Sequence, residues 1–295
     1  MEPIHIRFLR FSAFYSPLLL TMAGGHLREQ GLEATSDLVG PGRSTADGIR
    51  DGSVQVGQTA LAVSFAPWER GEHLPFRHFA MLNDRDGFFL AARGGDPATF
   101  TWERLVGKRV LVDHLFQPKA MFEEALRMKG VDPAAVHIVD VGDVTAMERA
   151  FRAGEGDVLH LQGPVPQQLE AEGLARVVAS VGEVVGPVVF SSLCASPAWL
   201  VTPQAAAFMR AFRKGCVHAV EASPEEIAAL TSAYFPHIER EVLVRTIRDY
   251  QRLGCWAGGT EIPRDLYDRT VAIFLRSGEI TAPVPMDAVV APAPG

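Results

Sequence analysis

Cysteine is scarce in this chain of 295 residues, and the few present exclude a disulfide framework. Cys194, Cys216 and Cys255 are odd in number and widely spaced, and no CxxC pair offers a structural metal site. We expect them to be free and buried as small apolar side chains. No stretch approaches the roughly 18 consecutive apolar residues of a membrane span, so no span is predicted.

Lysine is scarce as well, with four lysines beside 24 arginines. The net charge of −7 and the pI near 5.7 argue against nucleic acid as the main partner. The composition, 47% hydrophobic and 21% charged, is that of an ordinary globular protein. The length allows a large core and favours a division into two structural units.

Motifs for several reaction classes are also absent. The sequence has no P-loop, no GxSxG and no HExxH. Gly40-Pro41-Gly42 lacks the third glycine of a dinucleotide fingerprint. We therefore predict neither a catalytic constellation nor a cofactor site.

A secretory leader is not found either. A predicted strand begins by Ile4, and the apolar run Leu18-Leu19-Leu20 is short and follows a proline. We expect a cytoplasmic protein from the sequence as written, and a periplasmic one if the native gene adds a leader.

Two stretches about a hundred residues apart follow the same order of features. Each has a predicted strand, a loop, a proline in the first helical turn, a helix, a glycine that ends it and another strand. The counterparts are offset by 101, 99 and 102 residues and are Pro17 with Pro118, Gly31 with Gly130 and Gly52 with Gly154. Any two βαβ units share some of these features, but the near-constant offset favours two similar α/β lobes.

The chain divides at two predicted crossings between these lobes, the polar segment 83–86 and an apolar strand at 186–190. Helical patterns follow and are expected to pack on the first lobe; they cover 203–221, 224–232, 238–253 and 263–276. The predicted domains are lobe 1 at 1–84, lobe 2 at 85–188, a return to lobe 1 at 189–281, and a loose tail with four prolines at 282–295.

Three motifs carry a resemblance to a known family. They are Gly107-Lys108-Arg109-Val110, the Phe-Arg-Ala-Gly-Glu-Gly-Asp-Val run at 151–158, and the ending Trp256…Ile262-Pro263…Tyr267…Gly278-Glu279-Ile280. In this order, over nearly the whole chain, they resemble type II periplasmic binding proteins. Within that group the chain is similar to the alkanesulfonate, taurine, nitrate and thiamine-pyrimidine-precursor binding proteins of ABC transporters.

The resemblance implies a two-lobed α/β fold, with two doubly wound sheets joined by two crossing strands. It also implies hinge closure over a small-molecule ligand and an ABC transporter permease as protein partner.

The same fold hosts enzymes, among them pyrimidine-phosphate synthases, aromatic sulfinate desulfinases and dihydroxyphthalate decarboxylases. The synthases carry a cysteine-rich motif and a cofactor-bearing lysine in the first lobe, whereas this chain has no cysteine or lysine before Lys108. The desulfinases use a cysteine after the first strand, where this chain has Phe14 and Tyr15. Neither chemistry transfers to this sequence.

Ligands of open α/β sheets bind beyond the carboxyl ends of the strands, near helix N-termini. The loops expected there supply the predicted ligand-binding residues, which are Ser12, Phe14, Tyr15, Arg43, Ser44, Gln58, Thr59, Asn83, Asp113, His114 and Phe116. Arg43 is the leading candidate, because a guanidinium between glycines and a helix start suits a carboxylate, sulfonate or phosphate. A surface arginine in a mobile loop is the alternative.

Phe14, Tyr15 and Phe116 are predicted to stack on a planar ligand, with ordinary core packing as the alternative. Asp113 and His114 could recognise an amine or, in an enzyme, act as acid and base; a helix-cap neighbour beside a partly exposed histidine is the alternative. Asp113, His114 and His160 lack the spacing of a known metal site, and no metal is predicted.

These residues predict capture of a small organic or anionic solute in the cleft, for an ABC transporter or as an intracellular sensor. The alternative is an intracellular enzyme on the same fold, a lyase, decarboxylase or desulfinase-like protein acting on an aromatic acid. The ligand itself is not predicted, because loop residues rather than the fold set specificity.

Overall fold

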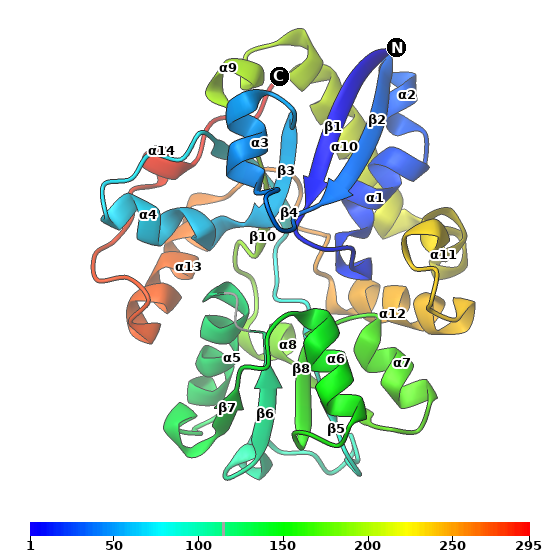
Figure 1. Cartoon of the computed structure of the whole chain (residues 1–295), viewed down its shortest axis with the longest axis vertical. Helices are drawn as coiled ribbons and strands as arrows, with labels where there is room; N and C mark the ends of the chain where they lie inside the picture. The colour runs from blue at the N-terminus through cyan, green and yellow to red at the C-terminus, as the bar shows by residue number, and fades with distance from the viewer. Residues whose placement is uncertain (114–115) are drawn as a thin grey trace.

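The computed structural model describes residues 1–113 and 116–295 and has two α/β lobes, drawn one above the other in Figure 1. The first lobe has a sheet of order β2-β1-β3-β10-β4. Its strands are β1 (Glu2–Phe8), β2 (Leu32–Leu38), β3 (Val56–Ala60), β4 (Arg77–Asn83) and β10 (Ser191–Ala195). β1 is parallel to β2 and β3, whereas β10 is antiparallel to β3 and β4.

The second lobe has a sheet of order β7-β6-β8-β5-β9. Its strands are β5 (Phe88–Ala92), β6 (Arg109–Val112), β7 (His137–Val139), β8 (Val158–Gln162) and β9 (Arg176–Ser180). β6 is parallel to β7 and β8, whereas β5 is antiparallel to β8 and β9.

The two sheets repeat one another strand by strand. Each has a strand with two parallel neighbours, then an antiparallel strand and an edge strand. The antiparallel strand, β10 or β5, is the one that the chain enters after crossing from the other lobe. Gly31 and Gly130 have φ of 78° and 74°, the left-handed conformation predicted at these helix ends. The duplication and the two-lobed fold are therefore confirmed.

The helices alternate with the strands in both lobes and continue after the chain returns. The first lobe has α1 (Ser16–Ala23), α2 (His26–Glu29), α3 (Thr45–Asp51) and α4 (Phe65–Glu69). The second lobe has α5 (Phe116–Met128), α6 (Val144–Arg152), α7 (Val165–Ala171) and α8 (Val181–Val185). After the return come α9 (Pro197–Leu200), α10 (Pro203–Glu221), α11 (Pro224–Thr231), α12 (Arg240–Leu253), α13 (Arg264–Ser277) and α14 (Met286–Val289). Within the described ranges, none of these helices has the length and hydropathy needed to cross a bilayer.

The late helices connect the two lobes instead of covering only the first. α10 and α11 pack against α1, as predicted, but α12 also packs on α7 and α13 on α5. Figure 1 shows α12 at the level where the lobes meet. Arg245 of α12 forms a 2.9 Å ion pair with Glu170 of α7, and Arg276 of α13 binds Glu124 of α5 at 2.6 Å. The expectation that these helices pack on the first lobe is incomplete, because α13 contacts Phe65 of α4 there but, like α12, also pairs with an acidic residue on the second lobe.

Residues 282–295 are not the loose tail that was predicted. Val284 and Val289 are buried, and the N–H of Ala291 donates to the carbonyl of His78 at 2.8 Å. Valine side chains between the prolines bury against the first lobe, and that burial holds the segment in place despite its proline content.

The two crossings, 84–87 and 186–190, lie side by side. The N–H of Val188 donates to the carbonyl of Asp84 at 2.8 Å, and the N–H of Phe190 donates to that of Asn83 at 3.0 Å. The predicted strand at 186–190 is not formed, and β10 begins at Ser191. These residues bond to the other crossing instead of joining a sheet.

Candidate functional site

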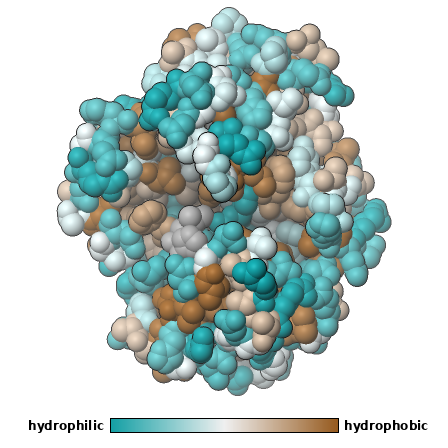
Figure 2. All heavy atoms as spheres, viewed as in Figure 1, coloured by the Kyte–Doolittle hydropathy of each residue, from teal (hydrophilic) through white to brown (hydrophobic). Residues whose placement is uncertain are grey.

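A small cavity of about 80 Å³ lies between the lobes. Both lobes and the second crossing supply its walls, which are Leu9, Arg10, Tyr15, Ala60, Ala62, Val63, Phe88, Phe116, Gln117, Pro118, Gln162, Phe190 and Ser191. Figure 2 shows hydrophobic residues gathered around the waist of the molecule, between largely hydrophilic outer surfaces. Ligand pockets commonly measure about 300–1,000 Å³. This cavity is smaller than that range, and the lobes are in contact beside it, where Ser12 donates to the carbonyl of Gly163 at 2.7 Å.

Aromatic rings form much of this wall. Tyr15, Phe88 and Phe190 are almost completely buried, whereas Phe116 is 57% exposed at the rim. Phe88 stacks on His160 with ring centroids 4.6 Å apart. Phe190 packs 5.9 Å from Phe88. The cavity therefore presents flat apolar faces, three fixed by the core and one open to solvent.

One cation lines the cavity among the described residues, and it is Arg10, which follows β1 closely. Its guanidinium forms an ion pair with the carboxylate of Asp113, which follows β6 in the other lobe. The Arg10 side chain is 17% exposed and the Asp113 side chain 3% exposed. The pair thus joins the carboxyl ends of equivalent strands across the cleft.

The two glutamine side chains of the wall differ in whether their amide oxygen has a hydrogen-bond partner among the described residues. Gln117 donates to the carbonyls of Val189 at 3.0 Å and Phe190 at 2.9 Å, and its oxygen accepts from Ala62 at 3.3 Å. Gln162 donates to the hydroxyl of Tyr15 at 3.2 Å. Its oxygen is buried and has no hydrogen-bond donor within 1–113 and 116–295. Gln162 therefore keeps an acceptor for a bound molecule.

Two titratable groups at or behind this wall, Tyr15 and His160, are held neutral by burial. Burial raises the pKa of the Tyr15 phenol, and the nearby Arg10 only partly opposes this. Burial lowers the pKa of His160 to about 3. Both side chains are therefore uncharged at neutral pH, and His160 supports the wall from behind Phe88.

Two of the predicted residues make structural hydrogen bonds beside the cavity. The hydroxyl of Ser12 donates to the carbonyl of Gly163 at 2.7 Å and so joins the two lobes. Asn83 donates to the carbonyl of Phe14 at 2.8 Å, within the first lobe. The ring of Phe14 is fully buried, 5.3 Å from Tyr250, and does not line the cavity.

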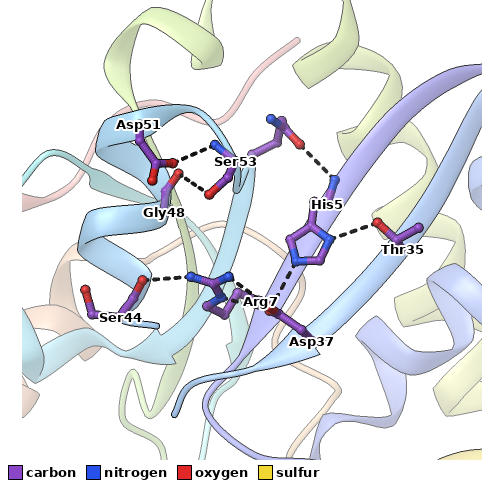
Figure 3. A network of polar contacts seen from close by, with 9 residues as sticks. His5, Arg7, Thr35, Asp37, Ser44, Gly48, Asp51 and Ser53 are labelled. Atoms are coloured by element: carbon purple, nitrogen blue, oxygen red, sulfur yellow. Dashed lines mark hydrogen bonds and ion pairs between the residues drawn. The ribbon is translucent and has the colours of Figure 1, made fainter. Parts of the chain in front are cut away.

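The predicted anion loop lies apart from the cavity lining. Arg43 is exposed in a turn, where its N–H donates to the carbonyl of Gly40 at 2.9 Å. Ser44 caps α3 and accepts through its carbonyl from Arg7 at 2.9 Å. Arg7 also holds Asp37 through two bonds of 2.8 Å, as Figure 3 shows. This network fixes α3 on the sheet, and neither Arg43 nor Ser44 borders the cavity.

The remaining candidates are spread around the cleft. Gln58 is buried, and its oxygen accepts from the N–H of Leu9 at 3.1 Å, which holds the loop after β1. Thr59 pairs with Ser192 in the sheet. His114 lies outside the described residues. In the part of the chain that the structure describes, no three or more His, Cys, Asp and Glu side chains are arranged to hold a metal ion.

Sequence reasoning brought Tyr15, Asp113 and Phe116 to this cleft and missed Arg10. The turn at Gln162 and Gly163 is also expected at the cleft from the sequence, but without a binding role for Gln162. Arg10 looks like the continuation of β1, but it stands outside the carboxyl end of that strand, next to Leu9. Gln162 is the last residue of β8. A polar residue at the end of a parallel strand was the available signal for Arg10.

Comparison with known proteins gives consistent matches. A model of the family described as "NMT1/THI5 like" matches residues 14–227. The putative binding protein YtlA of Bacillus subtilis (strain 168) is 24% identical over 283 residues, covering 95% of this chain and 84% of that protein.

Solved structures share the fold. The alkanesulfonate-binding protein SsuA from Xanthomonas axonopodis pv. citri, bound to MOPS, gives a TM-score of 0.75 at 15% identity over 99% of each chain. The periplasmic nitrate-binding protein NrtA from Synechocystis PCC 6803 gives 0.72 at 12% identity, over 98% of this chain and 84% of that chain.

Proposed function

Since this chain belongs to the NMT1/THI5-like family, we propose that it is a solute-binding protein that encloses a small organic molecule between its lobes. The observation that carries the proposal is the cavity walled by both lobes and by the second crossing. A site divided in this way exists only when the lobes are closed, so solute binding and closure are coupled. As part of an import system the protein would pass its solute to a membrane permease, and it would work in the periplasm when exported.

Closure is supported by bonds that span the cleft. Arg10 pairs with Asp113, and Ser12 donates to Gly163 at 2.7 Å. Gln117 of α5 reaches both the second crossing and the N–H of Ala62. These bonds form again each time the lobes meet, and a solute adds its own contacts to them.

The enzymatic alternative rests on weaker ground. It assigns proton transfer to Asp113 and His114, but the Asp113 carboxylate is engaged by Arg10 and His114 lies outside the described residues. His160, the other histidine near the wall, is neutral and fully buried behind Phe88. We therefore favour binding without turnover.

A thermal-shift screen of aromatic amides, aromatic carboxylates, sulfonates and amino acids tests the proposal, with chemical analysis of each hit after incubation. Ala60→Phe places a ring in the cavity wall and should abolish stabilisation by every hit. Ala98→Phe adds the same ring at an exposed site outside the cavity and should leave the shift intact. Recovery of a converted product would overturn the binding role, and so would hits that Ala60→Phe does not affect.

A further inference from the structure

We propose that Asp113 is a built-in counter-ion that occupies Arg10, so that the cleft selects uncharged planar solutes and rejects anions. This inference rests on the proposed solute-binding function and names the chemical class of its ligand. It assigns Asp113 the role of a specificity determinant contributed by the second lobe.

The charge balance of the cavity disfavours an anionic solute. Arg10 is the sole cationic residue among the described walls, and its partner is a carboxylate with a side chain only 3% exposed. An anionic solute that took the guanidinium would separate Asp113 from this cation while both remain in a closed, poorly hydrated cleft. Separating a buried carboxylate from its cation is strongly unfavourable. An uncharged solute leaves the pair intact.

The remaining polar groups of the cavity favour a ligand with a hydrogen-bond donor. The Tyr15 hydroxyl and the Gln162 carboxamide are uncharged and meet at the cavity wall at 3.2 Å. The Gln162 oxygen is buried and takes no hydrogen bond from any described residue. A buried acceptor gains most from a ligand that brings an N–H or O–H donor.

The shape of the cavity favours a planar ligand. Tyr15, Phe88, Phe116 and Phe190 give the cavity flat faces from the first lobe, the second lobe and the crossing. Flat apolar rings pack well against another planar ring. The ligand class that fits the charge balance, the polar groups and the shape of the cavity is a planar, uncharged aromatic compound with a hydrogen-bond donor on one edge.

Matched probe pairs test this class. Benzamide and nicotinamide offer an N–H donor on an uncharged ring, and benzoate and nicotinate present a carboxylate in the same shape. Dissociation constants measured by calorimetry or ligand-observed NMR should favour each amide over its acid by about tenfold or more. Equal or tighter binding of the acids to the unaltered protein would overturn the inference and leave the solute-binding function standing.

Variants of the ion pair then change the preference in opposite directions. Asp113→Asn keeps the shape and frees Arg10, so binding of benzoate should tighten by about tenfold while benzamide changes little. Arg10→Gln leaves Asp113 without this cation, so a cationic probe, benzamidine, should bind more tightly instead. The double variant should still bind benzamide, and it should show neither the tighter binding of benzoate nor the tighter binding of benzamidine. It also supplies a test if either single variant fails to fold.

Two control variants distinguish a failure of this inference from a failure of the proposed solute-binding function. Asp268→Asn removes an exposed carboxylate paired with Arg264 on α13 and should change neither probe. Gln162→Leu should weaken the amides without improving the acids. If no probe or screened solute stabilises the protein, the proposed function fails. If every solute found is an anion bound with Asp113 intact, only the inference fails.

Discussion

The hydroxyl of Tyr250 on α12 accepts a 2.7 Å hydrogen bond from the backbone N–H of Gly163, directly after β8. The same hydroxyl donates to the carbonyl of Gly87 at 3.0 Å. One phenol thus ties a late helix to the first crossing and to the loop that receives Ser12 from the other lobe.

Tyr250→Phe removes both bonds and leaves a buried N–H and a buried carbonyl unpaired. We expect a loss of about 1–3 kcal/mol in the free energy of unfolding, measured by urea denaturation. Tyr234→Phe is the control, because that side chain is only partly buried, and it should change stability by less than about 0.5 kcal/mol. Equal effects of the two variants would contradict a structural role for the Tyr250 hydroxyl.

Gly182 permits the close approach of α8 to the first crossing. A Cβ atom there would lie 2.1 Å from the carbonyl oxygen of Asp86, so the backbone must shift. Gly182→Ala should cost about 1–3 kcal/mol of stability. Gly40→Ala is the matched control, because its Cβ would meet only the flexible Arg43 side chain at 3.3 Å. Thermal denaturation of both variants should separate them, and an unaffected Gly182→Ala protein would show that the crossing adapts.

Asp86 makes stability fall as pH rises. Burial raises the pKa of its carboxyl well above the ordinary value of 3.8. Between 3.8 and the raised pKa, the folded protein holds a proton that the unfolded chain has released, so the free energy of unfolding decreases with pH. Asp86→Asn keeps an oxygen for the N–H of Phe88, 2.6 Å away in the native protein, and cannot titrate. It should therefore be more stable than the native protein at about pH 7, and the gain should vanish towards about pH 4; parallel stability curves would refute this.

Asp37 affects stability in the opposite direction, because its contribution is lost as the pH falls. Its hydrogen bonds from Arg7 lower the pKa of the carboxyl from 3.8 to about 2 (Figure 3). This contribution is fully present above pH 3.8 and is lost as pH falls towards 2. Asp37→Asn should lower the free energy of unfolding by about 2 kcal/mol near neutral pH. Denaturation curves of the native protein and the Asp37→Asn variant should converge in acid, and a difference that persists at about pH 2 would assign the effect to packing instead.

Local chemistry explains what the sequence could predict of the fold. Gly31 and Gly130 end helices because only glycine adopts their left-handed backbone cheaply, and such constraints act within a few residues. Their repetition a hundred residues apart revealed two lobes. The tail at 282–295 was misjudged for the same reason, because its prolines are local information and the burial of Val284 and Val289 is not.

The site was harder to predict from the sequence than the fold, because its residues come from separated segments of the chain. Arg43 attracted attention through its local setting between glycines and a helix start, yet it lies outside the cavity lining. No neighbouring residue in the sequence marks Arg10 as a site residue. Its role is seen only in the folded chain, where it pairs with Asp113 of the other lobe.

Residue order and backbone preferences were enough to define the repeated α/β units, the positions of the two crossings and the lack of a recognisable catalytic motif. The folded chain was needed to show that α12 and α13 join the lobes, that the tail is packed and that Arg10 is paired within an aromatic cavity. Burial and charge pairing depend on which distant side chains meet, and that meeting is settled by the packing of the whole chain.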